Sequence, residues 1–158
     1  MQQSLINKYL PQFTFNEYHA TWMNASIKDC FIAAKSMDIG KSFLTKTLMN
    51  LRGLPTTDLT LQGFIKNIGF TYLEENLYNE FVIDASQKNI KIIWNFYFEA
   101  IKENKTLVST ETRILCLTKR SKSLFQLYWL VVKPFSGLTR LEMLRLIRKN
   151  VEIKKIQK

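Results

Sequence analysis

The hydrophobic pattern changes its period near residue 70. Before that point one segment, Phe13–Trp22, alternates aromatic and polar residues, which predicts a first strand. Apolar residues then recur three or four positions apart, as they do on one face of a helix. This spacing predicts helices over Ala25–Met37 and Lys41–Leu51 and a further helical turn over Thr60–Asn67.

The second half of the chain has a period of two and ends in a long helical segment. Strands are predicted over Phe70–Glu75, Leu77–Asp84, Asn89–Ile101 and Lys105–Lys119. The final helix is expected to be capped by Ser121 or Ser123, to kink at Pro134 and to reach about Val151. Strands do not alternate with helices here as a parallel sheet requires, so we expect antiparallel pairing.

The first part of the final helix, Leu124–Val132, is apolar nearly all round. Such a helix needs cover on more than one side, which a curved sheet would supply. The pattern therefore predicts the α+β class: a curved antiparallel sheet wrapped around a long C-terminal helix, with two or three short helices after the first strand. The 158 residues show no repeat or linker, so we expect a single domain over residues 1–158 with a core of about residues 12–153.

An acid and a base, Glu111 and Arg113, interrupt the last predicted strand. They lie two positions apart, so they share a face with neighbouring leucines. If Glu103 and Asn104 form a two-residue turn, continuous pairing sets Trp94 opposite Arg113 and Phe96 opposite Glu111, on the apolar face of the sheet. A turn of three or five residues reverses this parity and leaves the two charges outside, as a surface salt bridge.

The net charge of the chain limits the classes of molecule that it is expected to bind. The chain carries 23 Lys and Arg against 13 Asp and Glu, a formal net charge of +10, which favours anionic partners. Much of the excess lies in the last 20 residues. This segment is expected to form either a solvated helix end or a contact with an anionic membrane surface. The contact would be made by Arg145, Arg148, Lys149, Lys154 and Lys155. Nucleic-acid binding ranks third, because the order of elements differs from that of the common RNA-recognition sheet.

The side chains that usually hold metals and cofactors are sparse. Cys30 and Cys116 lie in apolar patterns without CxxC spacing, and His19 is the single histidine, so we expect no metal site. Glycine-rich phosphate loops and nucleophile motifs are missing from the sequence, and we expect no cofactor. Reduced cysteines and the lack of a signal-peptide pattern favour a cytoplasmic protein.

Three motifs follow one another along the chain. They are Leu51-Arg52-Gly53-Leu54-Pro55, Thr110-Glu111-Thr112-Arg113, and Tyr128-Trp129 followed by Pro134-Phe135-Ser136-Gly137. With these motifs the chain, from about Phe13 to Val151, resembles an uncharacterised bacterial branch of the START-like (SRPBCC) superfamily of helix-grip proteins. The resemblance implies a seven-stranded antiparallel sheet that grips the C-terminal helix around a hydrophobic tunnel. It also implies binding of lipids, sterols, polyketides or other apolar molecules; some members are aromatases, cyclases or hydroxylase subunits.

We therefore favour non-catalytic binding or carriage of a hydrophobic or amphipathic acidic molecule, lipid-like or polyketide-like, between the sheet and the C-terminal helix. Trp94, Phe96 and Phe98 would line the pocket, unless they are plain core, and Arg113 would meet a carboxylate or phosphate while Glu111 orients it. His19 is a further candidate contact. The alternative is a cofactor-independent cyclase or dehydratase with His19 or Glu111 as acid or base; no other catalytic residue is predicted.

Overall fold

The computed structural model describes residues 4–156. Its elements, in chain order, are α1 (Leu5–Tyr9), β1 (Phe15–Met23), α2 (Ile27–Lys35), a 3₁₀ turn η1 (Ile39–Lys41), α3 (Phe43–Leu51), α4 (Leu61–Asn67), β2 (Thr71–Asn76), β3 (Glu80–Asp84), β4 (Ile90–Lys102), β5 (Lys105–Cys116) and α5 (Lys119–Ile156). Each element that the hydrophobic pattern predicts is present, with ends shifted by a few residues. Helix α1 was not predicted.

Local hydrogen bonds explain where the helices begin and end. The hydroxyls of Ser26, Ser42 and Thr60 cap α2, α3 and α4 by accepting from backbone N–H groups three residues later. Thr118 serves α5 in the same way, since its hydroxyl accepts from the Ser121 N–H at 3.0 Å. The predicted cap at Ser121 or Ser123 is therefore wrong by a few residues. Gly53 follows the end of α3 with a φ of +65°, a conformation that glycine adopts without strain.

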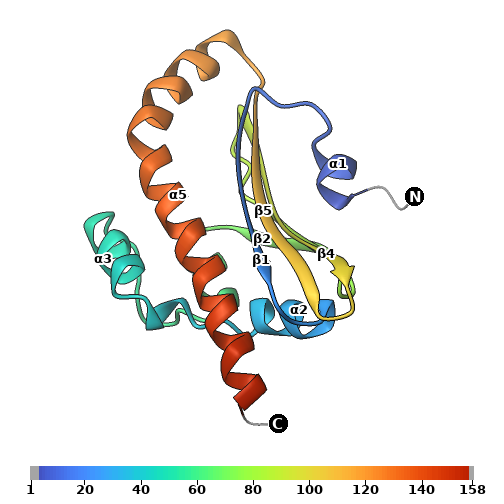
Figure 1. The fold of residues 1–158 in the computed structure, drawn as a ribbon. Helices are drawn as coiled ribbons and strands as arrows, with labels where there is room; N and C mark the ends of the chain where they lie inside the picture. Colours follow the sequence, from blue (N-terminus) through green and yellow to red (C-terminus); the bar gives the residue numbers. More distant parts are fainter. Residues whose placement is uncertain (1–3, 157–158) are drawn as a thin grey trace.

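The strands form one antiparallel sheet in the order β1-β5-β4-β3-β2. Residues 4–156 contain five strands in this sheet, not the seven that the family resemblance implies. Figure 1 shows α5 along one side of the curved sheet and α1 on the opposite side. We call these the concave and convex faces. The predicted α+β architecture, a curved antiparallel sheet with a long C-terminal helix, is confirmed.

The core lies between the concave face and α5, with α2 closing one end. Trp94, Phe96 and Phe98 on β4 are fully buried there, against Phe31 of α2 and Phe81 of β3. Their side of β4 is therefore the interior, as the sequence indicated. The lower part of α5 completes this core with Met143, Leu144, Ile147 and Val151.

The predicted pairing of the last two strands is wrong by one residue. The two-residue turn is present, because Lys102 pairs with Lys105, but the register shifts between Ala100 and Lys102. Such a bulge adds one residue to one strand and reverses every later side chain relative to its partner. Trp94 therefore faces Thr112, and Phe96 faces Thr110. Glu111 and Arg113 consequently lie on the convex face.

The two halves of helix α5 differ in their distance from the sheet. It continues through Pro134, and Figure 1 shows that its first half bows away from the sheet. The expectation that its apolar first half is covered on more than one side is wrong, because Leu127 and Leu130 are 69% and 72% exposed. No helix within residues 4–156 is long and apolar enough to cross a membrane.

Candidate functional site

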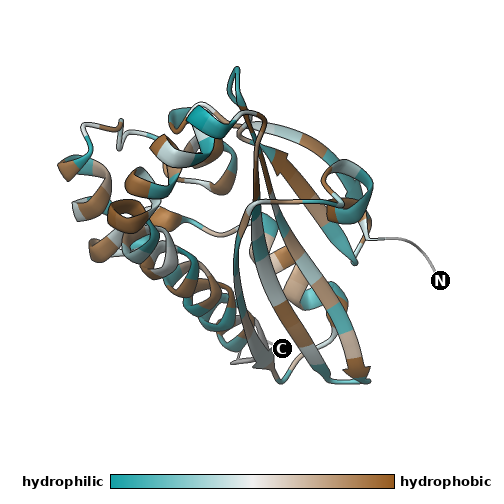
Figure 2. Ribbon diagram, turned by 90° about the horizontal axis from the view of Figure 1, so that it is seen from above, coloured by the Kyte–Doolittle hydropathy of each residue, from teal (hydrophilic) through white to brown (hydrophobic). Residues whose placement is uncertain are grey.

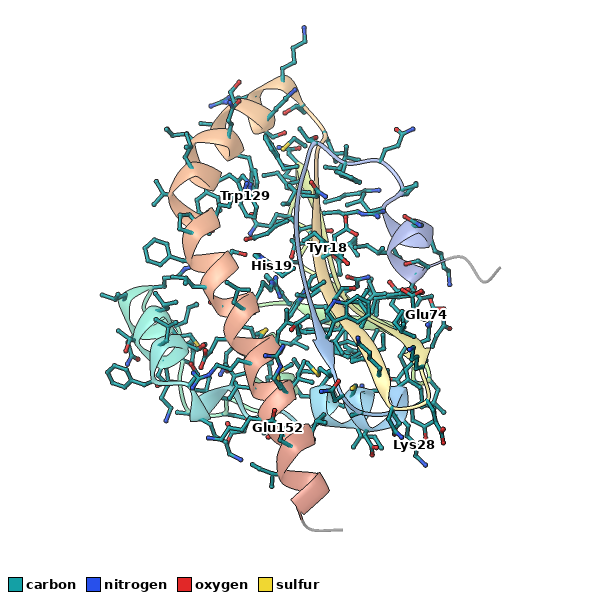
Figure 3. All side chains as sticks on the ribbon, viewed as in Figure 1. Tyr18, His19, Lys28, Glu74, Trp129 and Glu152 are labelled. Atoms are coloured by element: carbon teal, nitrogen blue, oxygen red, sulfur yellow. The ribbon has the colours of Figure 1, made fainter. Side chains whose placement is uncertain are left out.

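A cavity of about 510 Å³ lies where α5 bows away from the sheet. Its walls come from α3, α4, the concave face of β4 and β5, and the first half of α5. Most of its lining is apolar, including Met49, Phe64, Ile92, Phe125 and Trp129. The volume and the lining are typical of sites that hold small organic molecules. Figure 3 shows Trp129 between α5 and the sheet.

Two charged side chains line this apolar cavity: Arg52, which follows α3 and is exposed, and Arg140 of α5, which is buried. The guanidinium carbon of Arg140 lies 3.6 Å from the centre of the Trp94 ring, and its Nη2 donates to the Thr112 hydroxyl at 3.0 Å. Thr112 is its one hydrogen-bond partner within residues 4–156, although a guanidinium has five N–H donors. The site therefore holds a positive group whose hydrogen-bonding capacity is largely unused.

Burial lowers the pKa of Arg140 to about 9, while the charge of Glu17 acts in the opposite direction. At neutral pH the guanidinium therefore stays protonated. A second polar group of the cavity wall, the Thr45 hydroxyl, is buried without a hydrogen-bond partner in the described part of the chain. Because buried polar groups are normally paired, both side chains are suited to bind the polar end of a molecule in the cavity.

A second, more open groove runs between β1 and α5. It is lined by Glu17 and His19 of the strand and by Trp129, Lys133 and Gly137 of the helix, among others. His19 Nε2 lies 3.1 Å from Glu17 Oε1, whereas Glu17 Oε2 is buried without a hydrogen-bond partner among residues 4–156. Figure 3 shows His19 on the α5 side of β1 and Tyr18 on the other side. This histidine–carboxylate pair is an arrangement that can exchange a proton with a bound molecule.

Glycine at position 137 lets α5 approach this pair. A Cβ atom there would lie 2.8 Å from Glu17 Oε1 and 3.6 Å from His19 Nε2. The first distance is shorter than any normal contact, so a side chain at this position would displace the carboxylate.

Glu111 and Arg113, predicted to meet a ligand, instead hold α1 on the convex face. Arg113 donates to both carboxylate oxygens of Glu111, and its Nη1 donates to Asn7 Oδ1 at 2.6 Å and to the Leu10 carbonyl at 3.0 Å. Nearby Glu80, fully buried, accepts from the Leu5 and Ile6 N–H groups at the start of α1. The sheet lies between these charges and the cavity.

The other predicted site residues are divided between core and groove. Trp94, Phe96 and Phe98 do not line the cavity or the groove; they lie behind the cavity wall, where Trp94 supports Arg140. His19 lines the groove. The structure therefore does not bring the predicted set together at one place.

The basic tail makes several contacts within the chain. Arg145 pairs with Glu142 at 3.0 Å, and Arg148 donates to the Thr21 hydroxyl and the Trp22 carbonyl of β1. Lys149 is exposed. The side chains of Lys154 and Lys155 lie outside the described part of the structure.

Arg140 is the residue that sequence reasoning missed, because it was counted with the exposed cations of the tail. A signal was present: Arg140 precedes the buried Met143, Leu144 and Ile147 by three, four and seven positions, so it lies on the same helical stripe. Groups of His, Cys, Asp and Glu that could hold a metal ion are not found within residues 4–156.

Comparison with known proteins identifies the fold. No protein-family model matches the sequence, and no curated protein matches it. A mutant norcoclaurine synthase from Thalictrum flavum, in complex with a transition-state analogue, superposes with a TM-score of 0.52 at 12% identity, over 89% of this chain and 96% of that one. The same plant enzyme with dopamine and hydroxybenzaldehyde gives 0.50 at 11% identity, over 96% and 93%. A START superfamily protein from Mycobacterium smegmatis gives 0.42 at 10% identity, over 91% and 99%. The likeness to norcoclaurine synthase shows the fold, a curved antiparallel sheet wrapped around a long C-terminal helix.

Proposed function

We propose that the protein binds an amphipathic acidic molecule, lipid-like or polyketide-like, in the cavity between the sheet and α5, without transforming it. The observation that carries this proposal is Arg140: a buried, charged and largely unpaired guanidinium on the wall of an apolar cavity. The apolar body of the ligand would lie along the phenylalanine and methionine side chains of the lining. Its carboxylate or phosphate would accept hydrogen bonds from Arg140.

Energetics favour this role over a structural one. Arg140 has one hydrogen-bond partner within residues 4–156, and its desolvation is offset only in part by stacking on Trp94 and by the charge of Glu17. An anionic headgroup would supply the missing acceptors, in the bidentate geometry that guanidinium groups favour. Arg140 thus takes the place that the sequence assigned to Arg113. The structures of norcoclaurine synthase with dopamine and hydroxybenzaldehyde support the capacity of this fold to hold small molecules.

Calorimetric titration with dodecanoate and its uncharged counterpart dodecanol tests the proposal. Hydrogen bonds to charged groups contribute roughly 1.5–3 kcal/mol, so Arg140→Met should weaken dodecanoate binding about 10- to 100-fold and leave dodecanol binding nearly unchanged. Arg113→Met is the matched control, because it removes the arginine on the opposite face of the sheet, and dodecanoate affinity should not change. Equal losses for both ligands, or a larger loss in the Arg113 variant, would contradict the proposal.

A second candidate is a cofactor-independent enzyme of the cyclase or dehydratase type, which the Glu17–His19 pair favours. The pair places an imidazole, oriented by a buried carboxylate, in a groove with apolar walls. Glu111, the other acid or base candidate, lies on the opposite face and contributes nothing there.

Loss of the α-proton signals of a 1,3-diketone in D₂O, followed by NMR, measures this proton exchange. His19→Gln should abolish acceleration by the protein while dodecanoate binding persists. An equal exchange rate with and without the native protein would leave binding as the better account.

A further inference from the structure

A large apolar surface adjoins the cavity, through Leu124, and the groove, through Leu130. It comprises outward side chains of α3 and the first half of α5, six of which are 62–85% exposed: Phe43, Leu51, Leu124, Leu127, Leu130 and Val131. We call these six residues the rim surface. In Figure 2, hydrophobic segments of the helices lie at the left of the view, away from the sheet. Apolar patches of this kind on a protein surface usually mark a site of contact.

The rim surface is continuous with the cavity. Leu124 belongs to the cavity lining as well as to the exposed surface, and so do Tyr128 and Phe135. Arg52, which follows α3, donates to the Tyr128 hydroxyl at 3.2 Å, which joins the two helices at the entrance. Whatever contacts the rim surface therefore lies directly at the opening of the cavity.

Charge identifies the partner. Residues 41–57 and 117–141, which contain the two helical segments, include no Asp or Glu. Their exposed charges are all positive: Lys41, Lys46, Arg52, Lys119, Arg120, Lys122 and Lys133. Leucine, valine and phenylalanine among lysine and arginine match an anionic phospholipid surface, where the apolar side chains enter the acyl boundary and the cations meet the phosphates.

A second copy of the chain fits this surface poorly. In a two-fold dimer the same patch meets itself, so these cations would face their own equivalents without an acid to pair with. An acidic protein partner would satisfy the charges but would need an equally apolar patch of its own. The bilayer supplies both properties at once.

We propose that the rim surface docks on anionic phospholipid bilayers, which would place the cavity entrance against the lipid. The docking stands on exposure and charge alone. Its purpose, transfer of an amphipathic acid between the bilayer and the cavity, rests on the function proposed above.

Flotation of the full chain with phosphatidylcholine vesicles, prepared with and without phosphatidylglycerol, tests the docking. The native protein should float with vesicles that contain phosphatidylglycerol. When it is mixed with vesicles of phosphatidylcholine alone, it should remain at the bottom of the gradient. The double variant Leu127→Ser/Leu130→Ser should reduce vesicle binding at least about tenfold, because it removes two of the inserting side chains. Leu77→Ser is the matched control, since Leu77 is 65% exposed on the turn between β2 and β3, and it should bind as the native protein does.

Charge-reversal variants distinguish vesicle binding through the rim surface from vesicle binding through the basic tail. Lys119→Glu/Lys122→Glu should lower binding to phosphatidylglycerol vesicles at least about tenfold, whereas Arg145→Glu/Lys149→Glu should change it little. The reverse order would assign the contact to the tail and overturn the proposal. Dimerisation of the native protein in light scattering without vesicle binding would overturn it too, in favour of a second copy. Arg140→Met should not alter flotation, so a failure of ligand binding and a failure of docking can be told apart.

Discussion

Among residues 4–156, buried Glu80 on the convex face of the sheet accepts hydrogen bonds from four donors, whereas buried Arg140 on the concave face makes one hydrogen bond. The donors to Glu80 are the Ser4 hydroxyl, the Leu5 and Ile6 N–H groups and the Asn95 amide. Burial removes both charged groups from water. They differ in how many hydrogen bonds compensate for the lost hydration.

Saturated hydrogen bonding on the convex face serves structure. Glu80 caps α1 across 75 positions of sequence, and Arg113 with Glu111 holds its other end. The concave face leaves donors and acceptors unused at Arg140, Thr45 and Glu17, beside a cavity and a groove. Incomplete pairing next to open space is the pattern expected where a further molecule binds.

Removal of Glu80 should have the largest effect. Glu80→Ala leaves two N–H groups of α1 and the Asn95 amide without their acceptor, and breaking a buried charged network typically costs about 3–5 kcal/mol. Urea denaturation should show a loss of free energy of unfolding in that range. Glu74→Ala, which removes a partly exposed carboxylate that pairs with Lys8 and accepts from the Tyr9 hydroxyl, should cost much less. Similar effects of the two variants would contradict the contrast between the faces.

The sequence predicted the sheet, the helices and the inward side of β4, because period-two and period-3.6 patterns survive in a single chain. It misplaced Glu111 and Arg113 through one feature. The turn at residues 103–104 was predicted correctly, but an extra residue between Ala100 and Lys102 reverses the parity of everything beyond it. The alternating pattern of β5 gives no sign of a bulge in the neighbouring strand β4.

Helix α1 was missed for a different reason. Its five residues are too few for a periodic pattern, and its stability comes from Glu80 and Arg113, which are remote in sequence. The cavity is likewise a tertiary property, since it depends on how far α5 bows from the sheet. Arg140 alone could have been found from spacing, by its place on the buried stripe of Met143 and Ile147.

Arg140 should behave in the opposite way to Glu80. Replacement of both incompletely paired groups, in Arg140→Met/Glu17→Gln, removes the charges together and avoids stranding one of them. Stability should be unchanged or higher by up to about 4 kcal/mol, as for other buried charges replaced by less polar groups. Urea denaturation measures the change, and dodecanoate binding should fall in the same protein. A loss of 3–5 kcal/mol, the range expected for Glu80, would show that Arg140 is a structural charge after all.

The smallest effect on stability, and the sharpest local one, is expected at Gly137. Alanine at this position favours the helix by roughly 1 kcal/mol, but its Cβ would lie 2.8 Å from Glu17 Oε1. These effects oppose each other, because the carboxylate is the far end of a flexible side chain that can move at moderate cost. The free energy of unfolding should therefore change by less than about 1 kcal/mol, while the Glu17–His19 contact is lost. Since His19 is the single histidine, its imidazole NMR signals report that loss without ambiguity. Unchanged signals would mean that α5 shifts instead of the Glu17 side chain, and would contradict the close packing of the helix on this pair.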